Sequence, residues 1–148
     1  NQKHHVRELI RDMGSNKAII ISTHILEEVD AVCSRALIID RGIVVLDGTP
    51  EELHSKSRYH NAVALRAKGN EANRAAKILK SIPDVGSVEK HDEVDGVSLL
   101  IIPRAGKFIA DIVGSTVKDN GIEVVEMHTE AGKLDEVFRQ LTVEAGGD

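Results

Sequence analysis

The chain has 148 residues, enough for one ordinary domain or two small ones, and its composition is 41% hydrophobic but only 2% aromatic. Aliphatic side chains must therefore form the core, and the formal net charge of −5 argues against a nucleic-acid partner. The single cysteine, Cys33, excludes an internal disulfide, and no apolar run approaches the roughly 20 residues that a membrane-spanning helix needs.

The first elements in chain order are a helix, a strand and a second helix. Apolar residues at helical spacing predict a helix over residues 2–13 that ends at Gly14. A strand is predicted over residues 17–22, because residues 18–21 are apolar and three of them are β-branched, as in a strand that is buried on both faces of a parallel α/β sheet. The period becomes helical again from Ile25 to Cys33.

His24 lies between the carboxyl end of this predicted strand and the amino end of the following helix. Ligands of open α/β sheets bind at the carboxyl ends of the strands, and the amino ends of helices attract anions. An imidazole at this position could hydrogen-bond a phosphate oxygen, while Ser22 and Thr23 shape the turn. The alternative is that His24 only caps the helix or satisfies a loop carbonyl, and position alone does not decide between the two.

A hairpin and a capped helix follow. Residues 35–40 and 43–47 read as two strands joined by a tight turn at Arg41-Gly42. Thr49 and Glu52 form a capping box around Pro50, which predicts a helix that runs to about Lys56. A polar stretch over residues 55–61 then suits a domain boundary.

The second half of the chain has the element order β-α-β-β-α-β, which is the ferredoxin-like arrangement. The hairpin turn between its middle strands is predicted at Asp95-Gly96, and Phe108, Ile109, Ile112 and Val113 are expected on the apolar side of its second helix. These elements are predicted over residues 62–67, 71–82, 85–93, 97–102, 107–118 and 122–127, and a last helix follows over residues 134–141 with Leu134, Val137, Phe138 and Leu141 inward.

Four separated stretches follow one another in a recognisable order: Ser22–Val29 (STHILEEV), Cys33–Arg35 (CSR), Ala36–Gly42 (ALIIDRG) and Gly48–Leu53 (GTPEEL). Together they resemble the C-terminal part of the ATP-binding subunit of an ATP-binding-cassette (ABC) transporter. In that family the histidine of the Ser-Thr-His sequence is the switch histidine, which contacts the γ-phosphate of ATP, so the resemblance gives this role to His24.

The family's remaining ATPase motifs are not in these 148 residues. There is no G-x-x-x-x-G-K-[ST] phosphate loop, no signature sequence like L-S-G-G-Q, and no apolar strand that ends in Asp-Glu. We therefore expect a fragment that does not hydrolyse ATP alone and needs no cofactor. The resemblance implies ATP and Mg in the full protein, a second ATPase subunit in a homodimer, a transmembrane permease subunit, and a cytoplasmic location at the membrane's inner face.

The resemblance extends loosely to the C-terminus, because ATPases of drug and antibiotic exporters carry an extension that ends in a word similar to Leu134–Thr142 (LDEVFRQLT). The expected class is thus α/β, with the C-terminal piece of a P-loop ATPase domain over residues 1–57 and a small α+β ferredoxin-like accessory domain over residues 58–148. The alternative function is a non-enzymatic ligand-binding or dimerisation module. Exposed strands at Ala18–Ser22 and Ala36–Ile39 predict that the fragment self-associates.

Overall fold

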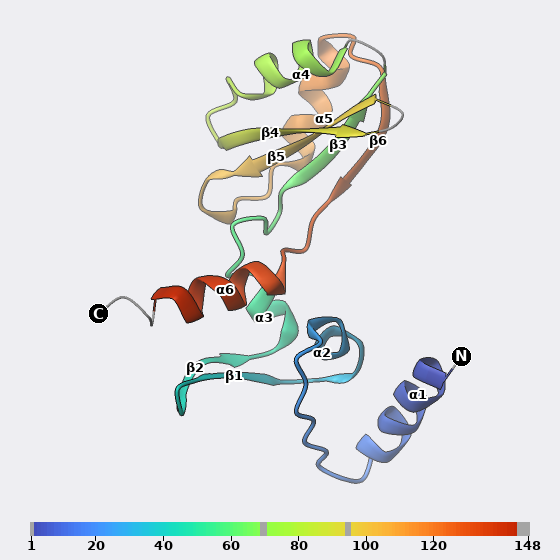
Figure 1. Ribbon diagram of the computed structural model, residues 1–148. Helices are drawn as coiled ribbons and strands as arrows, with labels where there is room; N and C mark the ends of the chain where they lie inside the picture. The colour runs from blue at the N-terminus through green and yellow to red at the C-terminus, as the bar shows by residue number, and fades with distance from the viewer. Residues whose placement is uncertain (1, 69–70, 94–95, 145–148) are drawn as a thin grey trace. The chain divides into compact units, whose positions relative to one another are not determined.

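The computed structural model describes residues 2–68, 71–93 and 96–144, which form two compact units. The first unit contains the chain up to Leu53 and again from Leu134, and the second unit contains His54–Lys133 (Figure 1). The last helix therefore belongs to the first unit. The division into domains at residues 57 and 58 stays a prediction.

The first unit consists of short elements. Its small core is Ile38, Leu53 and Leu134, against which Leu26 and Leu141 pack. The predicted helices and the predicted hairpin are confirmed, and β1 pairs antiparallel with β2. The elements are α1 (Gln2–Gly14), α2 (Leu26–Val32), β1 (Ala36–Asp40), β2 (Ile43–Gly48), α3 (Pro50–His54) and α6 (Leu134–Glu144).

Local side-chain chemistry explains the hairpin turn and the start of α3. Arg41 and Gly42 both have positive φ, at 49° and 81°, as the primed turns of tight hairpins require. The Thr49 N–H donates to Glu52 Oε2 over 2.8 Å, and the Glu52 N–H donates back to Thr49 Oγ1 over 3.2 Å. This reciprocal pair is the predicted capping box.

The strand predicted over residues 17–22 is wrong. Residues 18–22 form neither helix nor strand, and the Ile20 side chain is 97% exposed. A strand exists only when a neighbour pairs with its backbone groups. No strand among the described residues pairs with this segment, so its apolar residues stay in solvent.

Over its described residues, the second unit forms a four-stranded sheet with two α-helices. The predicted β-α-β-β-α-β order is present, the strand order in the sheet is β4-β5-β3-β6, and all neighbouring strands are antiparallel. Asp95, in the predicted hairpin turn, lies outside the described residues. The elements are β3 (Val63–Ala67), α4 (Glu71–Leu79), β4 (Val85–Glu93), β5 (Gly96–Pro103), a 3-10 turn (Arg104–Gly106), α5 (Ala110–Asp119) and β6 (Val124–Thr129).

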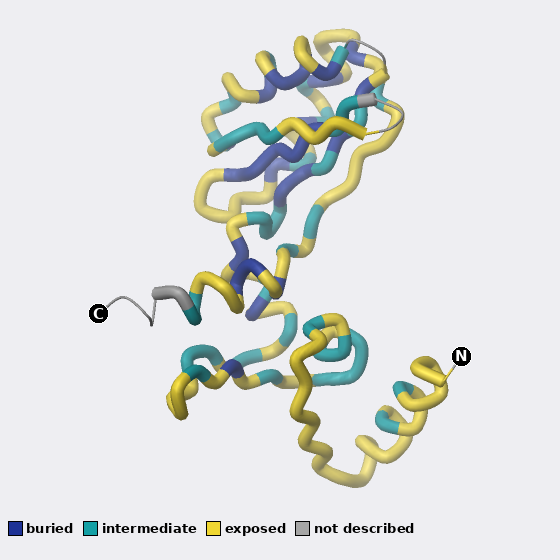
Figure 2. Tube along the Cα trace, viewed as in Figure 1, coloured by how far each residue is buried: buried dark blue, intermediate teal, exposed yellow. Residues whose placement is uncertain are grey.

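The core of the second unit lies between one face of this sheet and the two helices. Val63, Leu65 and Ala67 alternate along β3 and are buried, together with Leu79 of α4 and Val113 of α5. Figure 2 shows buried stretches on both the sheet and the helices of this unit. The alternating positions of the same strands face the other side of the sheet. That second face, left open by α4 and α5, carries the polar side chains that line the pocket below.

Three of the predicted core positions are wrong. Phe108 is 62% exposed and Ile112 is 45% exposed, although both were expected on the apolar side of a helix. The helix begins only at Ala110, so Phe108 precedes it, and the buried face is carried by Val113 and Val117. In α6, Phe138 is exposed, whereas Leu134 and Val137 are buried as expected.

Candidate functional site

His24 lies in an exposed bend directly before α2. The Ile25 N–H donates to Thr23 Oγ1 over 2.9 Å, so Thr23 shapes this bend as the sequence predicted. Ile25 occupies the N-cap position of α2 without a side-chain cap. The imidazole of His24 is therefore presented to solvent at the end of an irregular segment.

The helix after His24 brings carboxylates with it. α2 has seven residues, and Glu27 and Glu28 occupy its first turn. Arg7 of α1 donates two hydrogen bonds to Glu28, over 2.9 and 3.1 Å, and this contact holds the pKa of Glu28 below its usual value. The carboxylates offset the attraction that a helix amino end has for anions, so the imidazole is the group that could meet a phosphate oxygen.

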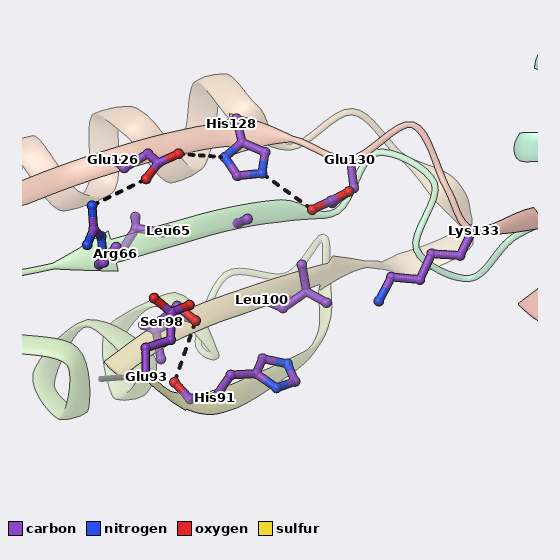
Figure 3. A pocket seen from close by; sticks show the side chains of 12 residues that line it. Leu65, Arg66, His91, Glu93, Ser98, Leu100, Glu126, His128, Glu130 and Lys133 are labelled. Atoms are coloured by element: carbon purple, nitrogen blue, oxygen red, sulfur yellow. Dashed lines mark hydrogen bonds and ion pairs between the residues drawn. The ribbon is translucent and has the colours of Figure 1, made fainter. Parts of the chain in front are cut away.

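A pocket of about 350 Å³ lies on the open face of the second unit's sheet (Figure 3). Its lining includes the apolar residues Ala64 and Leu100. In Figure 3, Leu100 lies among charged side chains. The sticks in Figure 3 come from all four strands and from the segment after β6. The lining charged and histidine side chains are Arg66, His91, Glu93, Glu126, His128, Glu130 and Lys133.

A line of contacts between a histidine, two glutamates and an arginine runs along one side of this pocket. His128 lies between two glutamates, with Nδ1 3.6 Å from Glu126 Oε1 and Nε2 3.4 Å from Glu130 Oε1 (Figure 3). Arg66 of the neighbouring strand is 3.4 Å from the other oxygen of Glu126. Across the pocket, the Lys133 ammonium lies 4.4 Å from the centre of the Tyr59 ring. These groups suit the binding of a polar or charged ligand.

The sequence interpretation did not identify this open-face pocket. The available signal was weak: alternate positions share one face of a sheet, but in the strands predicted over residues 62–67 and 97–102 only Arg66 and Ser98 are polar. Over the described ranges, no group of three or more His, Cys, Asp and Glu side chains could hold a metal ion. In the same ranges, no helix is long and apolar enough to cross a membrane.

Two histidines outside the pocket hold the chain where it enters and leaves the second unit. His54 Nδ1 is 3.1 Å from the Gly132 carbonyl oxygen, and His60 Nδ1 is 2.7 Å from the Ala131 carbonyl oxygen. The buried Ser57 hydroxyl accepts the Lys133 N–H over 3.1 Å. The two connecting segments are thus bonded to each other, which gives these histidines a structural role.

The chain is similar to several ATP-binding proteins that are named for drug resistance. It is 27% identical to the daunorubicin resistance ATP-binding protein DrrA2 of Streptomyces coeruleorubidus, over 93% of this chain and 41% of that protein. It is 29% identical to the linearmycin resistance ATP-binding protein LnrL of Bacillus subtilis, over 95% of this chain and 44% of that protein. The chain is homologous to ATP-binding proteins of drug-resistance ABC transporters.

The homology covers a part of these relatives. The chain spans about two fifths of the length of DrrA2 and LnrL. A shorter stretch is 43% identical to the human phospholipid-transporting ATPase ABCA3, over 58 residues that make up 39% of this chain and 3% of that protein. No protein-family model matches the chain.

Proposed function

We propose that this chain is the C-terminal part of the ATP-binding subunit of an ABC transporter, and that His24 contacts the γ-phosphate of ATP in the whole protein. The observation that carries the proposal is an exposed histidine in a bend before α2, in a chain homologous to drug-resistance ATP-binding proteins over nearly its whole length. Thr23 supports this role because its hydroxyl fixes the bend that presents the imidazole.

In the whole protein, two such subunits close around two molecules of Mg-ATP and move a separate permease in the membrane. The subunit then works in the cytoplasm, at the inner face of the membrane, and the transport it drives is export. Catalysis of phosphoryl transfer is mostly positioning and electrostatic stabilisation. The contribution of this chain is the His24 imidazole, which hydrogen-bonds the γ-phosphate and orients the attacking water.

We assign the second unit an accessory role and the ferredoxin-like fold. The support is its β-α-β-β-α-β order and the sheet order β4-β5-β3-β6, in which the hairpin strand β5 lies between β4 and β3. This is the split βαβ topology. On this proposal the accessory domain covers residues 58–148, which include the sheet of the second unit and also α6 of the first unit. It follows the ATPase part at residues 1–57 and regulates the contact between two subunits.

The first test is the coding DNA upstream of Asn1. A phosphate-loop motif and an Asp-Glu strand end within about 200 codons would support the proposal, since that is the span of one domain. A start codon beside Asn1 with an upstream stop codon would contradict it.

The second test is His24→Ala in the complete protein. We expect ATP hydrolysis to be abolished while nucleotide binding is retained, because the imidazole acts on the γ-phosphate and the remaining contacts hold the nucleotide. His5→Ala, an exposed histidine of α1, is the matched control and keeps full activity. Unchanged hydrolysis in His24→Ala would refute the assigned role.

A second candidate function is ligand binding by the second unit. The open-face pocket of about 350 Å³, with apolar residues and three glutamates in its lining, favours it. Daunorubicin, the drug in the names of two relatives, is a suitable probe because it combines flat aromatic rings with one amine. Saturable binding that weakens in Glu93→Gln would support this function, and binding unaffected by that change would count against it.

A further inference from the structure

The strand β6 leaves one edge of the second unit's sheet unpaired. It lies at the end of the strand order and pairs only with β3 among the described strands. Val125 and Met127 are exposed on it, by 55% and 41% respectively. An exposed strand edge is a template for pairing with another chain.

The two edges of this sheet are protected to different degrees. The opposite edge strand, β4, contains Lys90 and Asp92 among several charged residues, which discourage pairing. β6 has the sequence VVEMHT, without lysine or proline, which are the usual guards of a free edge. The composition of β6 therefore fits an edge that is used for binding.

Hydrogen bonds next to β6 show which of its residues can reach a partner. The Glu130 N–H donates to the Ala62 carbonyl over 2.7 Å, and the Glu130 carbonyl accepts the Asn61 N–H over 3.0 Å. Glu130 thus directs both backbone groups toward the β3 side. Backbone directions alternate along an antiparallel strand, so those of Met127 point toward the free edge.

Charge selects one register for the pairing of two copies of β6. If Met127 faces itself across a two-fold axis, Glu126 faces His128 of the second copy, and His128 faces Glu126 of that copy. A two-fold at Glu126 would place two glutamates opposite each other, and a two-fold at His128 would place Glu126 opposite Glu130 of the other copy. Like charges directly opposite are destabilising, so of these three registers the one centred on Met127 is favoured.

We infer that two copies of this chain associate through β6, antiparallel, with Met127 at the two-fold axis and Glu126 opposite His128 of the second copy. Met127 of one copy then exchanges two backbone hydrogen bonds with Met127 of the other copy, and the two sheets join into one. The apolar side chains of Met127 from both copies meet on the face that carries the helices. This pairing uses the second unit alone, so it stands independently of the proposed ATPase role.

A cysteine cross-linking experiment tests the register. In a Cys33→Ala background of the full 148-residue chain, we expect Met127→Cys to give a covalent dimer on oxidation, because paired residues lie about 5.5 Å apart between Cα atoms. Thr129→Cys is the matched control on the same strand. In the proposed register the two Cα atoms of residue 129 are roughly 14 Å apart, too far for a disulfide. Thr129→Cys should therefore give no covalent dimer on a non-reducing gel.

A charge experiment tests the energetics by sedimentation equilibrium. Met127→Lys places two lysines opposite each other and should raise the dimer dissociation constant at least about tenfold. Phe108→Lys introduces the same charge at an exposed apolar residue outside β6 and should leave that constant unchanged. The unfolding midpoint of each variant, measured in parallel, separates loss of pairing from loss of fold.

A charge swap tests the contact between Glu126 and His128. His128→Glu alone should weaken the dimer because it places two glutamates opposite each other, and adding Glu126→Lys should restore it because opposite charges then face each other. The inference is overturned by a monomeric mass at all concentrations, by equal cross-linking of Met127→Cys and Thr129→Cys, or by the absence of cross-linking in Met127→Cys.

Discussion

Arg7 and Glu28 are 21 residues apart and form a two-pronged ion pair, with hydrogen bonds of 2.9 and 3.1 Å. This pair connects α1 to α2, and Arg11 adds a hydrogen bond of 2.8 Å to the Ala31 carbonyl. The apolar stripe of α1 is exposed, with no residue of the helix buried. Polar contacts therefore hold α1 beside the helix that follows His24.

We predict that lowering the pH detaches α1. The hydrogen bonds from Arg7 lower the pKa of Glu28 from its ordinary value of 4.5. A lowered carboxyl pKa contributes stability that is fully present above 4.5 and is lost as the pH falls through the value in the folded protein. Amide hydrogens of α1, corrected for intrinsic rates, should therefore exchange faster at pH 3 than at pH 6.

The variant Arg7→Ala checks the cause of that pH dependence. It should give fast exchange in α1 at both pH values, because Glu28 then has no guanidinium to bind. Arg139→Ala removes an exposed arginine paired within α6, to Asp135, and should leave the exchange of α1 as in the parent chain. Slow exchange of α1 at pH 3 in the parent chain would contradict the prediction.

Gly132 is predicted to be intolerant of any side chain. Its φ is +122°, and an added Cβ would lie 2.4 Å from the His54 carbonyl oxygen and 3.1 Å from Ser57 Cβ. Gly132→Ala should lower the free energy of unfolding by about 1–3 kcal/mol for the backbone conformation alone, with the clash adding to it. Gly14→Ala, where nothing lies within 4 Å, is the control and should cost nothing measurable in chemical denaturation.

Truncation to alanine should be far more destabilising at Leu65 than at Phe108. Leu65 is fully buried between β3 and the helices, so Leu65→Ala should lower the free energy of unfolding by about 2–5 kcal/mol. Phe108 is mostly exposed, and Phe108→Ala should change it by less than about 0.5 kcal/mol. Urea denaturation measures both changes. A large decrease in the free energy of unfolding for Phe108→Ala would contradict this prediction and support a core position for Phe108, as the sequence pattern had indicated.

The elements that sequence reasoning predicted well are those with local causes. The capping box at Thr49 and Glu52 and the turn at Arg41-Gly42 depend on residues within four positions of each other. The β-α-β-β-α-β order follows from alternation and helical spacing inside each segment. Such signals survive without knowledge of the tertiary contacts.

The features that sequence reasoning missed depend on contacts between distant residues. Leu134 packs with Ile38 and Leu53, which are 96 and 81 residues away along the chain. No local sequence pattern predicts which distant residues it packs against. The open-face pocket needs Arg66, His91 and Glu126 on one side of one sheet, which requires the strand order. His24 is placed in an exposed bend, but its role in phosphate contact rests on the family resemblance and stays a proposal.

The exposed segment before His24 should promote self-association of the chain independently of β6. Ile20 is almost fully exposed, and its neighbours Ile19 and Ile21 are also on the surface. Exposed apolar residues on unpaired extended backbone favour association with other chains. Ile20→Lys should therefore reduce concentration-dependent light scattering, while oxidation of Met127→Cys in the same chain still gives the covalent dimer.

Ser15→Lys, on an exposed polar position nearby, adds the same charge as a control and should leave the scattering unchanged. Equal scattering from Ile20→Lys and the parent chain would show that this segment does not drive association.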